Sequence, residues 1–355
     1  SFTDISNTIG FFTDNKHTTG ASFGDIDNDG DLDAFICNRD DDNEAERNYL
    51  YQNNNGVYTD ISIGAGIIAT SEISFCAVFF DYNNDGFQDI YVSNDKPTYP
   101  NRLYKNNGDS TFEDTSETSG AGISINAMTS TIGDYNNDGW FDIYVTNTPD
   151  GNQLLKNNGD GTFTDTARDT GTEFNSVGWG AVFLDADNDT HLDLYVSGEF
   201  DGTNSSLLPS AFYHNQGDDT FQIPSNIGFE NDTRKSYSNA IGDIDNDGKP
   251  DIAATNDTET NFLFNNNSTN TNNWITIQLE GTTGNKDGIG NRIEVFAGGT
   301  SQYRYTLCGE GYLSQNSSKE FIGLGTATSI DYIKVTWSHS GVVEIIEQVA
   351  INQSI

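Results

Sequence analysis

The segment Phe23–Asp33 reads Phe-Gly-Asp-Ile-Asp-Asn-Asp-Gly-Asp-Leu-Asp and carries acidic side chains at alternate positions. A hard divalent cation such as Ca²⁺ takes about six to eight oxygen ligands, and one tight loop can supply most of them. Gly30, at position six counted from Asp25, suits a backbone with positive φ. A strand-forming run, Ala34–Cys37, follows, whereas a helix would flank an EF-hand loop. The segment therefore predicts a calcium loop that joins two strands.

This nine-residue loop recurs along the chain at intervals of roughly 50 to 60 residues. A single copy could be a solvated turn, because Asp, Asn and Gly enter turns freely. Repetition at a regular interval favours metal loops in an array of strand-and-turn units, as in a propeller. The copies are Asp25–Asp33, Asp81–Asp89, Asp134–Asp142, Asp185–Asp193 and Asp243–Asp251.

We expect about five structural Ca²⁺ ions, one per loop. Each ion would be held by the side chains at positions one, three, five and nine and by the carbonyl at position seven. The fourth loop is expected to be the weakest or most distorted, since Thr190 stands where the others have Gly. The predicted metal-binding residues are Asp25, Asp27, Asp29, Asp31, Asp33, Asp81, Asn83, Asp85, Phe87, Asp89, Asp134, Asn136, Asp138, Trp140, Asp142, Asp185, Asp187, Asp189, His191, Asp193, Asp243, Asp245, Asp247, Lys249 and Asp251.

Each repeat predicts four strands, two around the metal loop and two around a later Gly turn. The fifth repeat runs into a polar Asn-rich stretch after its third strand and shows no fourth strand. At the start of the chain, Ser1–Ser6 matches the fourth-strand pattern of Val57–Ser62 and Thr111–Ser116. We therefore predict an all-β fold over residues 1–268. It would be a five-bladed propeller of four-stranded blades, in which the N-terminal strand Phe2–Ile5 completes the fifth blade and closes the ring.

Phe23–Asp33 and the four later loops resemble the FG-GAP or VCBS repeats of integrin α-chain propellers and of many bacterial secreted proteins. The resemblance implies that the metal loops join the first and second strands of each blade on a lower face. It also implies that the loops between blades, and those after each second strand, form an upper face where partners dock. Calcium loops of this kind are normally filled outside cells, so we expect a secreted or cell-surface protein.

The repeat ends before Trp274, and residues 273–355 predict a small C-terminal β-sandwich of six strands. Six strands do not divide into four-stranded blades, which favours a separate domain over further blades of a larger ring. This part resembles the ASPIC/UnbV domain at Asn285–Val295, Gly309–Gln315, Gly323–Gly325 and Trp337. The usual Trp-Pro-x-Gly turn of that family is replaced here by Trp337-Ser-His-Ser-Gly341.

The formal net charge of −38 argues against binding of nucleic acid and of anionic membranes. No apolar stretch approaches the roughly 18 residues that cross a bilayer, and no membrane insertion is expected. Cys37 and Cys76 align with small residues in other repeats, so packing is favoured over a disulfide, and three cysteines cannot all pair within the chain. Other domains of a larger secreted protein are possible partners.

Two function classes remain open from the sequence. The first is a calcium-binding adhesion or recognition scaffold whose upper face binds a protein or glycan; its candidate ligand-binding residues are His17, Glu72, Trp179, Arg234 and Tyr237. The second is a polysaccharide lyase or hydrolase at the axial mouth. His17, alone or with Glu72, Arg234 or Tyr237, would supply its acid–base chemistry. No nucleophile–base pair or carboxylate pair is legible, so we assign no catalytic residue and favour the scaffold.

Overall fold

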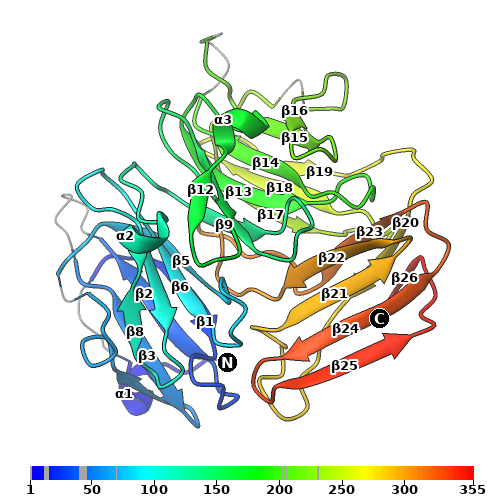
Figure 1. Ribbon diagram of the computed structural model, residues 1–355. Coiled ribbons are helices and arrows are strands. Elements are labelled where there is room, and N and C mark those ends of the chain that lie inside the picture. The colour runs from blue at the N-terminus through cyan, green and yellow to red at the C-terminus, as the bar shows by residue number, and fades with distance from the viewer. Residues whose placement is uncertain are drawn as a thin grey trace.

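A computed structural model describes residues 2–11, 16–39, 46–68, 70–200, 204, 206–229 and 232–355. The described chain is all-β apart from three helical turns of four residues each, α1 (Ser6–Ile9), α2 (Ser116–Ser119) and α3 (Ala167–Thr170). Its sheets are arranged around a centre, with the C-terminal part, orange to red, lying between the N-terminal blue sheets and the last green ones (Figure 1). The predicted all-β fold is confirmed.

Five antiparallel sheets follow one another along the chain, one for each repeat, and we call them blades one to five. The strands of blade one are β1 (Thr18–Gly24), β2 (Asp33–Asn38), β3 (Tyr49–Asn54) and β4 (Val57–Asp60); those of blade two are β5 (Ser74–Phe80), β6 (Asp89–Asn94), β7 (Arg102–Asn106) and β8 (Phe112–Asp114). Blade three contains β9 (Ser130–Gly133), β10 (Asp142–Val145), β11 (Gln153–Asn157) and β12 (Phe163–Asp165). Blade four contains β13 (Gly178–Leu184), β14 (Asp193–Gly198), β15 (Ala211–Asn215) and β16 (Phe221–Gln222), and blade five β17 (Ser236–Gly242), β18 (Asp251–Asn256) and β19 (Phe262–Phe264).

Hydrophobic cores lie between neighbouring blades. Tyr91 and Leu103 of blade two pack with Ile143 and Leu155 of blade three, and the same kind of layer joins blades one and two, three and four, and four and five. Inner strands also pack side by side, β1 on β5 and β13 on β17. The facing surfaces of adjoining blades are thus buried, which is why the strand interiors are nearly continuous apolar runs.

The predicted ring closure by the N-terminal strand is wrong. Blade five has three strands, and Phe2 is fully exposed and outside any strand. Gly228, in the turn before blade five, has no atom within 4 Å of the place where a Cβ would stand, whereas Gly66, Gly120 and Gly171 face fourth-strand carbonyls at the equivalent places. The slot for a fourth strand is therefore open in the described residues.

The N-terminal segment is held on blade one instead. Ile5 precedes the helical turn α1, and the ring of Phe11 lies 4.7 Å from Tyr51 and 4.6 Å from Tyr58, centroid to centroid. Among the described residues, β17 and β1 show no packing comparable with that of the other neighbouring inner strands. With the ring open at this point, the number of propeller blades stays a prediction.

The C-terminal part forms two sheets that face each other. One has the order β23 (Glu320–Gly325), β20 (Asn273–Ile277), β26 (Gln353–Ser354), and the other β22 (Thr300–Tyr305), β21 (Arg292–Ala297), β24 (Ile330–Trp337), β25 (Val342–Glu347). Ile275 and Ile322 of the first sheet share a core with Ile293 and Val335 of the second. All six predicted strands are present, and β26 is an additional short one that pairs in parallel with β20.

Candidate metal loops and upper mouth

The metal loops share one backbone geometry. Position four is Asn in every loop and has φ between 56° and 59°, and position six has φ between 85° and 94°. The carboxylate at position one accepts two backbone hydrogen bonds across the turn; Asp25 accepts them from Asp29 N at 3.0 Å and Gly30 N at 2.9 Å. The two residues with left-handed backbone conformation, together with the carboxylate that accepts two hydrogen bonds, fold the loop so that alternate side chains face inward.

The carboxylate at position nine ties each loop to the third strand of its blade. Asp33 accepts hydrogen bonds from Ile26 N at 2.8 Å and from Asn53 N at 2.7 Å, and it is completely buried. The equivalent aspartates make the same pair of bonds to their own loop and third strand. Position nine is therefore a fold-determining residue as well as a predicted ligand.

The asparagine at position four links each loop to the next. Asn28 Nδ2 donates to Gly86 O at 3.1 Å, and Asn137 Nδ2 donates to Thr190 O at 2.9 Å. Asn84 and Asn188 repeat the contact at 3.4 and 3.2 Å. This role was not predicted, although the presence of Asn at the same place in all the loops was a visible signal.

Position-seven side chains cover the turns between the third and fourth strands. Gly108, Gly159 and Gly217 in those turns lie against Phe87, Trp140 and His191, with space too small for a Cβ. The variable residue at position seven thus packs outward, which leaves only its backbone carbonyl as a possible ligand.

The loop carboxylates are crowded and partly buried, which favours protonation or a bound cation. Burial, with the neighbouring loop carboxylates, raises the pKa of Asp25 and Asp81 to about 6 and that of Asp33 to about 8. Oxygens of Asp25, Asp27 and Asp29 lie within 4.8 Å of one another. Asp27 Oδ1 and Asp187 Oδ1 are buried and have no hydrogen-bond partner. An oxygen donor set with orphaned carboxylate atoms fits a hard divalent cation.

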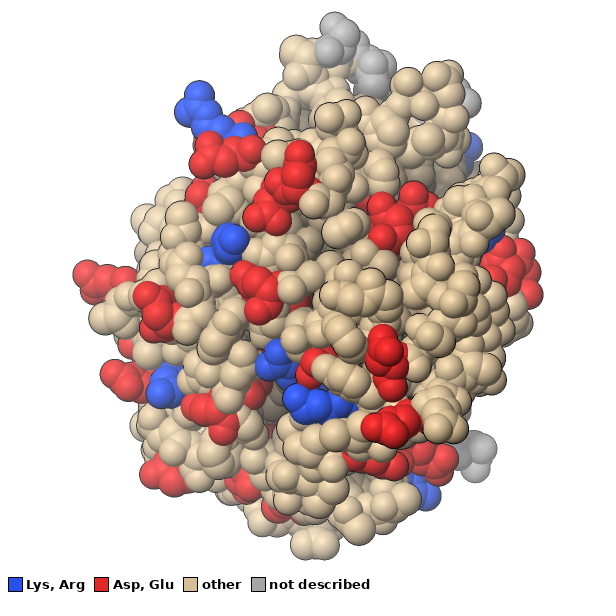
Figure 2. Space-filling view, turned by 45° about the vertical axis from the view of Figure 1, so that its right-hand side comes forward, with Lys and Arg blue, Asp and Glu red and all other residues tan. Residues whose placement is uncertain are grey.

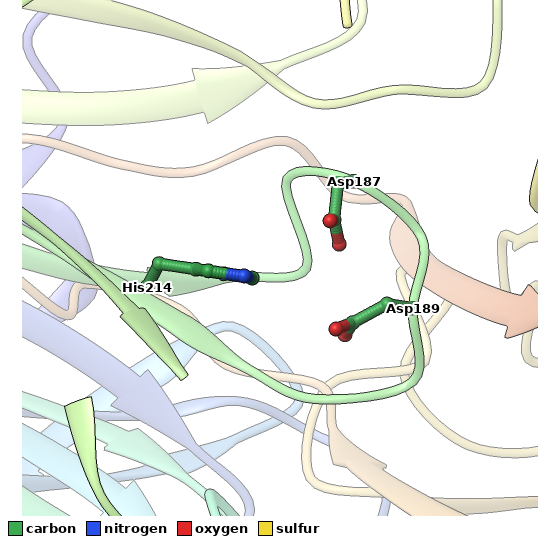
Figure 3. Close-up of side chains that lie close together, drawn as sticks. All are labelled: Asp187, Asp189 and His214. Atoms are coloured by element: carbon green, nitrogen blue, oxygen red, sulfur yellow. The ribbon is translucent and has the colours of Figure 1, made fainter. Parts of the chain in front are cut away.

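The fourth loop differs from the others. Thr190 has φ of 89°, so the turn keeps its shape and a β-branched residue carries the strain. His214 of β15 approaches the loop, with its Nδ1 2.9 Å from Asp193 Oδ1. Figure 3 shows its imidazole directed toward Asp187 and Asp189, and ligand atoms of these three residues lie within 4.8 Å of one another.

The C-terminal domain lies against the metal loops. Arg292 donates to Gly139 O at 2.8 Å and to Asn84, and Gly325 N donates to Asn188 O at 2.8 Å. His339 Nδ1 lies 2.7 Å from Asn28 O. The face that carries the loops is therefore covered by a second domain, a contact that the sequence did not predict.

One segment of that domain continues into the centre of the ring. Cys308 O accepts from Phe23 N on β1 at 3.2 Å, and Glu310 accepts from the Thr131 hydroxyl on β9 at 3.3 Å. Ser317 N then donates to Ile241 O on β17 at 3.0 Å. Residues 308–317, which we call the axial segment, thus contact the inner strands of blades one, three and five.

The axial segment reaches the end of the inner strands opposite the metal loops, which we call the upper mouth. The ring of Tyr312 lies 4.9 Å from Trp179 and 5.5 Å from Phe75, and Trp179 lies 4.8 Å from Tyr237. Trp179 and Tyr237, both predicted at this mouth, are thus brought together. Arg39 lies over Phe75, with its Cζ 4.3 Å from the ring centroid.

The other predicted ligand residues are placed differently. His17 lies at the upper mouth, where it lines a hollow with Arg39 and Tyr312. Glu72 is a correction: it is 2% exposed and accepts from Arg102 Nε at 2.7 Å, so it cannot contact a ligand on the surface. Arg234 pairs with Glu259 and lies over Phe262 in blade five, with its Cζ 4.3 Å from the ring centroid, and its contact with a ligand stays a prediction.

Comparison with family profiles settles what these repeats are. The profile described as FG-GAP-like repeat matches residues 25–92, 81–145, 134–196 and 203–254. The chain belongs to the FG-GAP-like repeat family. Residues 281–355 match the profile described as ASPIC and UnbV, so the C-terminal domain of this FG-GAP protein is also assigned as predicted.

No curated protein is similar enough in sequence to this FG-GAP protein to count as a match. Two solved crystal structures of "BBS1N in complex with ARL6DN", one soaked with lead and one with mercury, each share 9% identity with it. Both matches cover 94% of this chain and 92% of the other, with a TM-score of 0.40, a value too low to support an argument. Within the described ranges, no helix has the length and apolar character that a bilayer crossing requires.

Proposed function

We propose that this protein is a calcium-stabilised extracellular propeller whose upper mouth binds a ligand, with an acidic glycan as the ligand that its side chains favour. The observation that carries the proposal is the hollow at the upper mouth. It has a volume of about 580 Å³ and is lined by Lys16, His17, Thr18, Thr19, Arg39, Phe75 and Tyr312.

The composition of this hollow contrasts with the rest of the surface. The chain has 54 acidic residues and only 16 Lys and Arg, and acidic side chains are spread over the whole face seen in Figure 2. Two of the few basic residues line one hollow beside a Tyr ring. Sugar rings stack on aromatic faces, and a guanidinium binds carboxylate or sulfate groups in a fixed geometry. This combination favours an acidic glycan over a neutral one.

Calcium would act on this site through the fold. The loop residues predicted to hold the ion lie at the opposite end of the inner strands, where Asp27 Oδ1 and Asp187 Oδ1 lack partners. A bound cation would offset the repulsion between loop carboxylates and so stiffen the blades that carry the hollow. The family is typical of extracellular proteins, where calcium is abundant, which supports secretion or display at a cell surface.

The experiment is a binding titration with a panel of acidic and neutral polysaccharides in the presence of calcium. Arg39→Ala should weaken binding by at least tenfold, as loss of an interface Arg usually does. Arg234→Ala is the matched control, because Arg234 also lies 4.3 Å over a Phe ring but in blade five, and it should leave binding unchanged. Equal effects of the two substitutions would reject the hollow as the site. If capture from an extracellular matrix preparation yields a protein ligand without glycan, the hollow would remain the binding site. The proposal of a glycan ligand would then be rejected.

The same samples test the enzyme alternative. A lyase or hydrolase would shorten the polysaccharide during incubation, which size-exclusion chromatography of the polysaccharide detects. Binding without shortening supports a recognition scaffold, whereas shortening that is lost in His17→Ala would support catalysis at the mouth.

A further inference from the structure

Among the described loops, the fourth is the only one whose cluster of acidic ligand atoms includes an imidazole, that of His214 on β15. In two other blades, the residue just before the recurring asparagine at the end of the third strand contacts position three of its loop. In blade one it is Gln52, which donates to Asp27 Oδ2 at 2.6 Å, and in blade five it is Asn265, which donates to Asp245 Oδ2 at 3.1 Å. In blade four this residue is His214. Among the described residues, only here does the third strand offer the loop a nitrogen ligand.

The histidine is held in a geometry typical of metal ligands. Its Nδ1 lies 2.9 Å from the fully buried carboxylate of Asp193, and a carboxylate bonded to one ring nitrogen orients the imidazole so that the other nitrogen can coordinate a metal. The side chain is directed toward Asp187 and Asp189, as Figure 3 shows. One oxygen of Asp187 is buried and accepts no hydrogen bond. The cluster therefore combines an imidazole nitrogen from His214, a carboxylate of Asp193 that orients this imidazole, and an Asp187 oxygen that has no hydrogen-bond partner.

We propose that Asp187, Asp189 and His214 bind a zinc-class divalent transition ion, in place of the calcium expected at this one loop. Calcium takes oxygen ligands almost exclusively, whereas imidazole combined with carboxylates suits zinc and its first-row neighbours. The strained Thr190 weakens the calcium loop at the same place, which reduces competition from the more abundant ion. The inference rests on the proposed calcium function for the other four loops only.

The test is a calorimetric titration of the full chain with Zn²⁺ in millimolar calcium, after removal of all metals. The wild-type protein should bind one zinc ion. His214→Gln installs the residue that blade one carries, and it should lower zinc affinity by tenfold or more while calcium binding rises by one site. His214→Asn, the residue of blade five, is a second variant in case the first fails to fold. Co²⁺ as a probe should show visible ligand-field bands in the wild type that both variants lose.

His191→Gln is the matched control, because His191 belongs to the same loop but its ring lies against the Gly217 turn outside the cluster. It should leave zinc affinity unchanged. The reciprocal variant Gln52→His should create a second zinc site in blade one.

Zinc binding that is equal in wild type and His214→Gln would overturn the inference, as would the absence of zinc binding in calcium. In either case, calcium titration of the remaining loops tests the calcium proposal independently of the zinc proposal. Failure of both titrations would reject both proposals, whereas calcium at five loops with no zinc would reject only this one.

Discussion

The ring of Tyr312, in the C-terminal domain, lies 4.9 Å from the ring of Trp179 in blade four. This contact joins the two domains at the upper mouth, although the C-terminal sheets contact the metal loops at the other end of the inner strands. The axial segment therefore spans the ring from one end to the other. A ligand at the upper mouth would touch both domains, so a propeller site and an ASPIC/UnbV site are not alternatives in this protein.

Removal of the Tyr312 ring should loosen the axial segment. Tyr312→Ala loses two aromatic contacts, with Trp179 and Phe75, and we expect it to lower the free energy of unfolding by about 2 kcal/mol. Tyr312→Phe keeps the ring and should remain close to wild type. Urea denaturation followed by tryptophan fluorescence measures both variants. An alanine variant as stable as the phenylalanine variant would show that the axial segment is held by its backbone contacts alone.

Calcium removal should lower stability. A ligand that binds only the folded chain adds about 2.7 kcal/mol per site at a hundredfold excess over its dissociation constant. Thermal unfolding with and without a chelator, at constant ionic strength, measures the effect, and magnesium serves as a control for general screening of charge. A melting temperature that is the same in chelator and in calcium would contradict the calcium proposal.

The metal-free protein should become less stable as pH rises from about 4 to about 8. Folding raises the pKa of Asp25 to about 6, of Asp134 to about 7 and of Asp33 to about 8, in each case first through burial. The folded chain then binds more protons than the unfolded chain in this window, and stability falls with pH wherever that holds. Calcium binds the ionised carboxylates, so it should flatten or reverse the trend. Denaturant midpoints at pH 5 and pH 8, with and without calcium, measure the trend. A metal-free protein that is more stable at pH 8 than at pH 5 would contradict the prediction.

The local features of this fold could be predicted from the sequence because they depend on neighbouring residues. The loops at Asp25 and its repeats combine acidic side chains with turn-forming Asn and Gly, and this chemistry acts within nine residues. The strand periodicity between loops is equally local. Trp179 and Tyr237 could be placed together because they occupy the same position in successive inner strands.

The features that were missed depend on which distant segments meet. Phe2–Ile5 has the fourth-strand pattern, and Asp4 accepts from Ser6 N as Asp114 accepts from Ser116 N, but the pattern does not say whether blades five and one come together. Glu72 was placed on the upper face because it lies in the loop between blades one and two, whereas its side chain is buried and pairs with Arg102, thirty residues later. The axial segment carries no repeat at all, so no periodicity could reveal its path.

Thr190→Gly should stabilise the protein by about 1 kcal/mol, because glycine adopts the observed φ of 89° without strain. Gly86→Thr is the reciprocal control. Gly86 has φ of 88° and no atom within 4 Å of the place that a Cβ would occupy, so the substitution adds strain without a clash and should destabilise by a similar amount. Equilibrium unfolding in urea compares the two. Destabilisation by Thr190→Gly would mean that the threonine side chain makes a contact worth more than its backbone strain.

Deletion of the first five residues should leave the free energy of unfolding within about 0.5 kcal/mol of the wild-type value. Changes at surface residues that make no special contact usually fall within this range. Phe2 and Ile5 are exposed, and Phe2–Asp4 contribute no strand to a sheet. Phe11→Ala, a few residues further on, should cost about 2 kcal/mol, because its ring stacks on Tyr51, meets Tyr58 edge to face and anchors the segment to blade one. Thermal and urea unfolding of the two variants make the comparison.

The two outcomes lead to different structures at blade five. If the deletion costs more stability than the Phe11 substitution, the N-terminal residues pair with β19 and the ring closes. If the Phe11 substitution costs more, as expected, the open edge of blade five is a stable feature of the fold.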